Sequence, residues 1–228
     1  MGHGARFYTR RVAPRQILTE EPRDQRLDRL VFLTDGIYAI AMTLLAFELI
    51  GGSTEDVGSG ELAEELWDRR SEVFAYVTSF LFVGNFWVGQ LMLFRHIHRF
   101  DGRLLWLVLT QLLLVAFMPF PTAIVGRHSS SQAALIFYFG TLALTAWSLA
   151  GLWWYVTAGR RLVDADLSEA AVRQGHRASL SIATAFSVLV ALVGLGVGEI
   201  VPGLLLAYLM AMVGVLMGVL VRDPDPDG

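Results

Sequence analysis

The sequence contains no cysteine, and all 18 of its basic residues are arginine. Without cysteine, disulfides and thiolate metal sites are excluded, and the redox compartment cannot be assigned. Charge is scarce as well. Charged residues make up 17% of the 228 positions, against about 25% in an ordinary soluble domain. The net charge of −3 gives no indication of a nucleic-acid partner.

Motifs for catalysis and for metal binding are also missing. The sequence has no HExxH motif and no recognisable pairing of a nucleophile with a base. His96 and His98 are two residues apart, a spacing that does not place them on one helix face, so they are not expected to bind a metal. The TVGYG potassium filter is absent too, although VGNF occurs in the second apolar segment. We therefore expect no enzyme, no metal and no cofactor.

Hydrophobic residues, by contrast, make up 54% of the chain and come in blocks. About 20 apolar residues span the hydrocarbon layer. The sequence predicts an all-α integral membrane protein with a cytoplasmic arginine-rich tail at 1–28, one membrane domain at 29–221 and a cytoplasmic tail at 222–228. The six predicted spans lie at about 30–50, 73–94, 104–125, 132–156, 178–198 and 201–221. Pro119 and Pro121 are expected to bend or end the third span, and a short helix is predicted at 166–174.

The arginines predict the orientation. With the N-terminus inside, 15 of the 18 arginines fall in cytoplasmic segments and 3 fall outside. Cytoplasmic loops of membrane proteins carry such an excess. We expect a multi-pass protein of the cell membrane with both termini in the cytoplasm.

The first span, RLVFLTDGIYAIAMTLLAFELI, contains two carboxylates, Asp35 and Glu48. A carboxylate inside a span costs roughly 2.5–3.5 kcal/mol on insertion scales, so Asp35 must pair, accept hydrogen bonds or take a proton. A structural network, a network that also takes part in gating, and a proton relay are all compatible with the sequence. The candidate partners are Arg29, Asn85, Trp87, Gln90, Thr110, Gln111 and the histidines of the 95–103 connector.

Another face of the same span is almost entirely apolar. At 100° per residue, Asp35 falls across the helix from Ile40. A stripe within about 60° of Ile40 consists of Leu33, Gly36, Ile40, Thr43, Leu44 and Phe47. By sequence alone, such a stripe most often faces lipid or packs in a core.

The start of this span resembles the transmembrane protein 175 potassium channels of lysosomes and bacteria. That family begins its first helix with Arg-x-x-x-Phe-Ser-Asp-Gly followed by Ala-Ile-x-x-Thr-Leu-Leu. This chain has Arg29, then Leu33-Thr34-Asp35-Gly36, then the string from Ala39 to Leu45. Two further segments are similar, SFLFVGNFWVGQ from Ser79 and PFPT at 119–122. In the former, Gln90 stands where a histidine is usual.

The resemblance implies a homotetrameric, potassium-permeable channel in which four copies of the first helix line the pore. It places the apolar constriction on Ile40, Leu44 and Phe47 and a polar ring on Thr43. Phe47 is bulkier than the aliphatic residue expected there. It also implies a network that fixes the helix in the bundle, made of Arg29, Thr34, Asp35 and Gly36.

Two points stay open at the level of the sequence. Glu48 is either a ring of charge at the pore mouth or an interfacial residue that reaches toward water. The alternative function is a proton-coupled transporter or proton-leak pathway that uses Asp35. The expected partners in either case are monovalent cations, the lipid bilayer and further copies of the chain.

Overall fold

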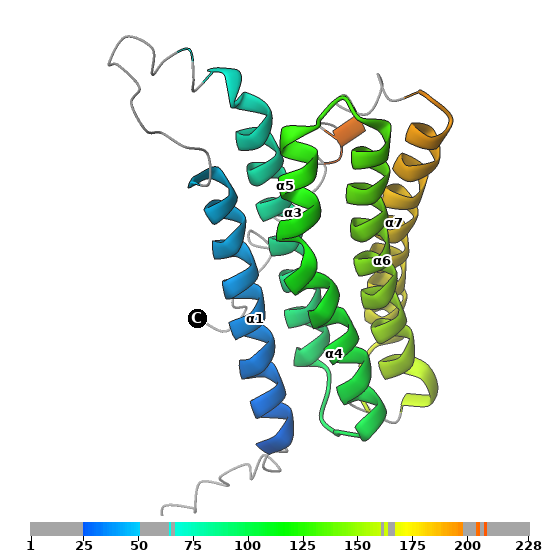
Figure 1. Cartoon of the computed structure of the whole chain (residues 1–228). Helices are drawn as coiled ribbons and strands as arrows, with labels where there is room; N and C mark the ends of the chain where they lie inside the picture. The colour runs from blue at the N-terminus through cyan, green and yellow to red at the C-terminus, as the bar shows by residue number, and fades with distance from the viewer. Residues whose placement is uncertain are drawn as a thin grey trace, which may run out of the picture.

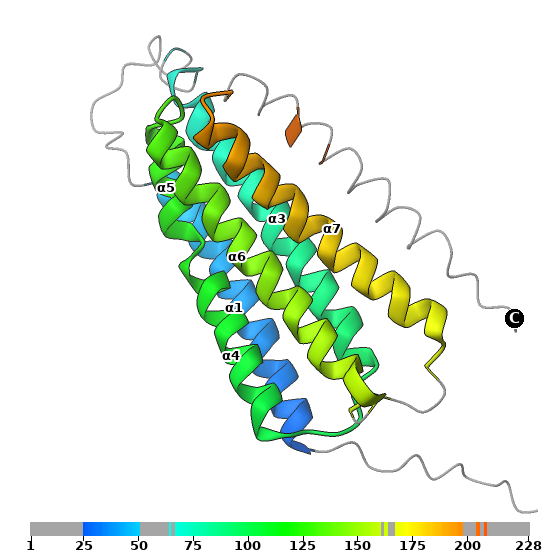
Figure 2. The same ribbon diagram turned by 90° about the vertical axis from the view of Figure 1, so that its right-hand side faces the viewer.

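The computed structural model describes residues 25–50, 64, 67–160, 162–163, 167–197, 204–205 and 208, without the side chains of Glu48 and Ile50. Most of these residues are helical, and the one β-type contact among them is an isolated bridge between Ile97 and Val163. The helices run side by side as a bundle (Figures 1 and 2).

Five stretches of helix are long and apolar enough to cross a membrane. They are α1 (Gln25–Ile50), α3 (Arg70–Arg95), α4 (Gly102–Phe117) with α5 (Pro119–Arg127), α6 (Gln132–Thr157) and α7 (Glu169–Gly194). The predictions of an all-helical fold and of several spans are therefore confirmed for this part of the chain. The predicted sixth span, 201–221, lies outside the described residues except for Leu204, Leu205 and Tyr208.

The third span is broken between α4 and α5 at the prolines. Pro119 is the first residue of α5, and its ring nitrogen cannot donate a hydrogen bond to the carbonyl of Val115. The backbone N–H of Met118 donates to that carbonyl instead, at 3.1 Å. The helix tightens by one residue there, and α5 continues the span.

The fifth span begins earlier than the sequence predicts. In place of a short helix followed by a span from 178, α7 runs unbroken from Glu169 to Gly194. Its start is capped by the Ser168 hydroxyl, which accepts from the N–H of Ala171 at 3.2 Å. The helix continues past the polar residues because it packs closely on α6. A Cβ added at Gly175 would lie 2.5 Å from the ring of Trp153.

The interior holds packed aromatic rings and paired polar groups. Phe186 of α7 meets Phe82 edge to face, with ring centroids 5.1 Å apart, and also contacts Phe86. Ser79 and Tyr138 share a hydrogen bond of 2.8 Å, and Thr122 donates to Ser79 at 2.9 Å. In a membrane, such packing and internal hydrogen bonds hold helices together, because lipid is as apolar as leucine.

One end of the bundle joins two connectors. There α1, α4 and α7 begin and α3 and α6 end (Figure 2). The N–H of His98, in the link from α3 to α4, donates to the carbonyl of Leu162 at 3.0 Å. Leu162 follows α6 and the short helix η1 (Ala158–Arg160). We call this the connector end.

Candidate functional site

Helix α1 turns its apolar stripe away from the rest of the subunit. Ile40 is 56% exposed and Phe47 68% exposed, whereas Tyr38 and Leu45 are fully buried. Leu33, Gly36, Thr43 and Leu44 are exposed as well. All six residues of the predicted stripe therefore lie together on one uncovered face, which we call the α1 stripe.

Thr43 is the polar member of the α1 stripe. Its hydroxyl donates to the carbonyl of Ile40 at 2.8 Å, in the preceding turn of the same helix. Since the hydroxyl proton is used within the helix, the lone pairs of the oxygen remain available on the exposed face. A ring of such oxygens is able to coordinate a cation.

Asp35 lies on the other side of α1 and is half-buried. The indole N–H of Trp87, on α3, donates to Asp35 Oδ1 at 2.9 Å. Trp87 was one of the candidate partners from the sequence. Arg29, which the resemblance assigns to the same network, is exposed and forms no hydrogen bond or ion pair within the part of the chain described. The structure thus joins Asp35 to α3 and does not join it to Arg29.

Thr34 and Gly36, the neighbours of Asp35 in the motif, have different environments. Thr34 is buried, and its hydroxyl donates to the carbonyl of Leu30 at 2.9 Å. Gly36 is exposed, and a Cβ added there would meet no atom within 4 Å. Within one subunit, therefore, no neighbour requires glycine at position 36.

A chain of buried polar side chains lies one helical turn beyond Asp35. The Tyr38 hydroxyl donates to Gln90 Oε1 at 3.0 Å and accepts from Gln111 Nε2 at 3.3 Å. Ser148 donates in turn to Gln111 Oε1. These four residues, which we call the Tyr38 chain, link α1, α3, α4 and α6. Sequence reasoning proposed Gln90 and Gln111 only as partners of Asp35 and missed Tyr38 and Ser148. The one available signal was that Tyr38 follows Asp35 by three residues on the same face.

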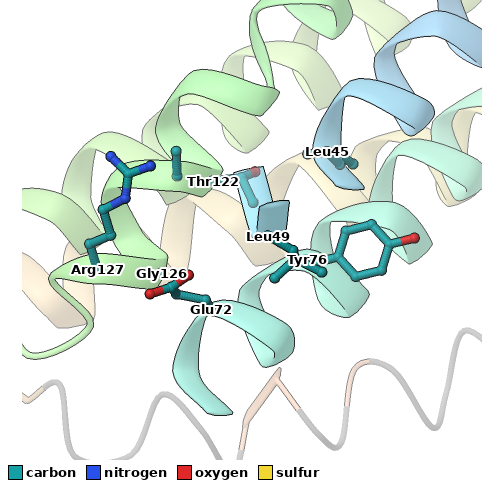
Figure 3. A pocket seen from close by; sticks show the side chains of 8 residues that line it. Leu45, Leu49, Glu72, Tyr76, Thr122, Gly126 and Arg127 are labelled. Carbon is teal, nitrogen blue, oxygen red and sulfur yellow. The ribbon is translucent and has the colours of Figure 1, made fainter. Parts of the chain in front are cut away.

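The far end of α1 is held by Arg69. Its guanidinium donates to the carbonyl of Leu49 at 2.7 Å and to Glu72 at 3.0 Å. Beside it, Leu45, Leu49, Glu72, Tyr76, Thr122, Ala123, Gly126 and Arg127 line a cavity of about 10 Å³ (Figure 3). A space of this size holds about one water molecule, so this cavity is not an ion path. The side chain of Glu48, for which the sequence left a mouth charge and an interfacial residue open, lies outside the part of the chain that the structure describes.

Comparison with known proteins identifies the family. Residues 29–119, which include most of α1 and all of α3 and α4, match the family described as endosomal/lysosomal potassium channel TMEM175. A potassium channel of Streptomyces collinus is 32% identical over 149 residues, which are 64% of this chain and 71% of the relative. The chain belongs to the TMEM175 family of potassium channels. Its relatives are channels, so the expectation that it is not an enzyme is confirmed.

Other TMEM175 relatives agree. A potassium channel of Chamaesiphon minutus is 28% identical over 64% of this chain and 73% of the relative. The crystal structure of a lysosomal potassium-selective channel TMEM175 homolog from Chamaesiphon minutus has 24% identity and a TM-score of 0.66, covering 83% of this chain and 97% of that one. This similarity shows the fold. The chain is a multi-pass membrane protein of the TMEM175 family.

Proposed function

We propose that this chain forms a homotetramer in the cell membrane, in which four copies of α1 enclose a path for potassium ions. The observation that carries the proposal is the α1 stripe, an uncovered face with Ile40 at its centre. A face that only touched lipid would have no use for Gly36, which lets the backbones of neighbouring helices approach closely. The choice of potassium as the permeant ion rests on the relatives, which are named potassium channels.

In this arrangement Ile40, Leu44 and Phe47 form successive apolar rings around the axis. A narrow apolar ring closes a channel by expelling water, so conduction depends on how far these side chains stand apart. The Thr43 oxygens lie between the rings of Ile40 and Leu44 and replace part of the hydration shell of the ion. In this proposal, ions move passively down their gradient.

The network of Asp35 then has a structural role. Its bond to Trp87 and the bonds of Tyr38 to Gln90 and Gln111 anchor the inner face of α1 to α3 and α4. This anchoring fixes the rotation of α1, and the rotation decides which residues reach the axis. We also place both termini in the cytoplasm, and Glu48 near the outer mouth as a source of negative charge that attracts cations.

The test is potassium flux into liposomes under a potassium gradient alone. Ile40→Ala and Ile40→Asn should raise the flux and loosen selectivity against sodium, since both widen or wet the narrowest ring. Leu144→Ala is the matched control, because Leu144 is 61% exposed on α6 and outside the α1 stripe. Unchanged flux in the Ile40 variants, or an equal change in the control, would refute the assignment of the constriction.

Proton-coupled transport through Asp35 is the alternative. It is favoured by the position of Asp35, a half-buried carboxylate that lies within a span and accepts a hydrogen bond from the neutral indole of Trp87. This function requires that a proton gradient drive potassium against its own gradient and that Asp35→Asn abolish this movement. A channel shows neither effect, so a liposome assay with opposed gradients separates the two.

A further inference from the structure

Charge is distributed unequally between the two ends of the bundle. Among the described side chains, the connector end carries eight arginines and three carboxylates, while the opposite end carries three of each. The arginines of the connector end are Arg26, Arg29, Arg95, Arg99, Arg103, Arg160, Arg173 and Arg177, and its carboxylates are Asp28, Asp101 and Glu169. The opposite end has Arg69, Arg70 and Arg127 with Glu64, Asp68 and Glu72.

Arg99 and Arg103 flank Asp101 in the sequence, and both oxygens of the Asp101 carboxylate already accept hydrogen bonds from other groups. Asp101 accepts the N–H of Leu104 at 2.7 Å on Oδ1 and the hydroxyl of Tyr155 at 2.5 Å on Oδ2. Arg99 and Arg103 are exposed, and their guanidinium groups form no hydrogen bond or ion pair with the part of the chain described. Both cations therefore remain available to an external anion.

The ionised form of Asp101 is stabilised although neither of these guanidinium groups is hydrogen-bonded to it. Burial favours its neutral form, but the hydrogen bonds from Tyr155, Leu104 and the Arg103 backbone, with the positive charge of Arg103, together outweigh burial and lower the pKa of the carboxyl. The carboxylate is satisfied mainly by neutral donors at the start of α4. It caps the helix and leaves the two cations at the surface.

Below Arg103, the outer face of α4 changes from charged to aromatic to apolar. Trp106 is 71% exposed, and Leu113 and Phe117 are exposed one and two turns beyond Thr110. The hydroxyl of Thr110 donates to the carbonyl of Trp106 at 2.9 Å, so this residue presents no unpaired donor to lipid. Tryptophan at such a level is typical of the membrane–water interface. We call Trp106, Thr110, Leu113 and Phe117 the α4 lane.

We propose that Arg99, Arg103 and the α4 lane form a binding site for an anionic phospholipid. The headgroup phosphate lies at the two guanidinium groups, which suit phosphate because each offers a planar pair of donors. The acyl chain lies along Leu113 and Phe117, past the ring of Trp106. A free phosphate ion would use the arginines and leave the lane uncovered, so the continuous lane favours a lipid. This site is independent of the proposed pore.

The test is a titration of the purified full chain in neutral detergent with phosphatidylglycerol or phosphatidylcholine, followed by native mass spectrometry. Arg99→Gln with Arg103→Gln should weaken phosphatidylglycerol binding more than tenfold, since each arginine near an anionic surface is worth about fivefold. Binding of phosphatidylcholine should be weak in both proteins. Arg70→Gln with Arg127→Gln removes the same charge at the opposite end and should change binding less than about twofold.

Two further arms make the outcome decisive. Inorganic phosphate at the same concentrations should not compete with phosphatidylglycerol; effective competition would assign the site to free phosphate and overturn the lipid proposal. Arg99→Gln alone covers the case in which the double variant does not fold, because Arg99 lies in an exposed connector. It should weaken binding about fivefold. Equal weakening by the control pair, or none by Arg99→Gln, would show that no specific site exists.

Discussion

Apart from Thr43, the described polar side chains within the α1 span lie on its inner face, whereas a helix in a soluble protein turns such side chains to solvent. The exposed face carries Ile40, Leu44 and Phe47, while the inner face carries Asp35 and Tyr38. Lipid offers no hydrogen-bond partners, so polar groups within a span must find theirs inside the protein. Apolar side chains have no such need and are left to face lipid, other subunits or a pore.

This difference separates stability from conduction along a single helix. The inner face is tied to three other helices by the Tyr38 chain and by Trp87. The α1 stripe touches little of its own subunit. Substitutions on the inner face should therefore unfold the subunit, whereas substitutions on the stripe should leave it folded and change the passage of ions.

The largest effect is expected for Tyr38→Ala. This change empties a fully buried site and leaves Gln90 and Gln111 without their shared partner, and such truncations cost about 3–5 kcal/mol. Thermal unfolding in detergent, followed by size-exclusion chromatography, should show a large loss for Tyr38→Ala. Ile40→Ala, two residues further on, should cost less than about 1 kcal/mol. Equal losses from the two variants would erase the distinction between the faces.

A smaller effect is expected for Trp87→Phe. Phenylalanine keeps most of the ring but removes the indole N–H that Asp35 accepts. Hydrogen bonds to charged groups are worth about 1.5–3 kcal/mol, and we expect a loss of that size in the same unfolding assay. Trp106→Phe is the control, because Trp106 is 71% exposed and its indole N–H donates to no acceptor among the described residues. Potassium selectivity in folded Trp87→Phe should match the parent protein; altered selectivity would place Asp35 in the ion path.

Much of this arrangement was predictable from the sequence, because hydropathy and helical periodicity are local. The existence of the five described spans followed from the length of the apolar segments, and the stripe through Ile40 followed from the angle between successive residues. Trp87 appeared among the partners proposed for Asp35 because few polar side chains occur in the second span. The break at Pro119 followed from the missing backbone N–H.

What the sequence did not predict depends on contacts between distant segments. Tyr38 meets Gln90 and Gln111 across 52 and 73 residues, and no local pattern indicates which glutamine faces which helix. Arg69 holds α1 through the carbonyl of Leu49, an acceptor that every residue possesses. The early start of α7 depends on Trp153 packing over Gly175. Hydropathy predicted that the span begins at 178, but packing against α6 lets the helix begin at Glu169.

Asp101, like Asp35, accepts a hydrogen bond from an aromatic side chain, but it lies at the edge of a membrane span and not within one. Asp35 accepts from Trp87 within a span, and Asp101 accepts from Tyr155 at the edge of one. Asp101 also receives the N–H of Leu104 at the start of α4. Water and a helix terminus are thus available to Asp101, and ionisation there costs far less than in lipid.

The smallest effect, and the one with a defined dependence on pH, is expected at Asp101. Since its pKa is lowered in the folded protein, its ionised form adds stability above the unfolded value near 3.9. That contribution is lost as the pH falls through the lower folded value. Asp101→Ala should lose about 1 kcal/mol of capping stability at neutral pH and unfold with less change between pH 5 and pH 3 than the parent. If the variant is as acid-sensitive as the parent, other carboxylates cause the acid response and Asp101 does not contribute to it.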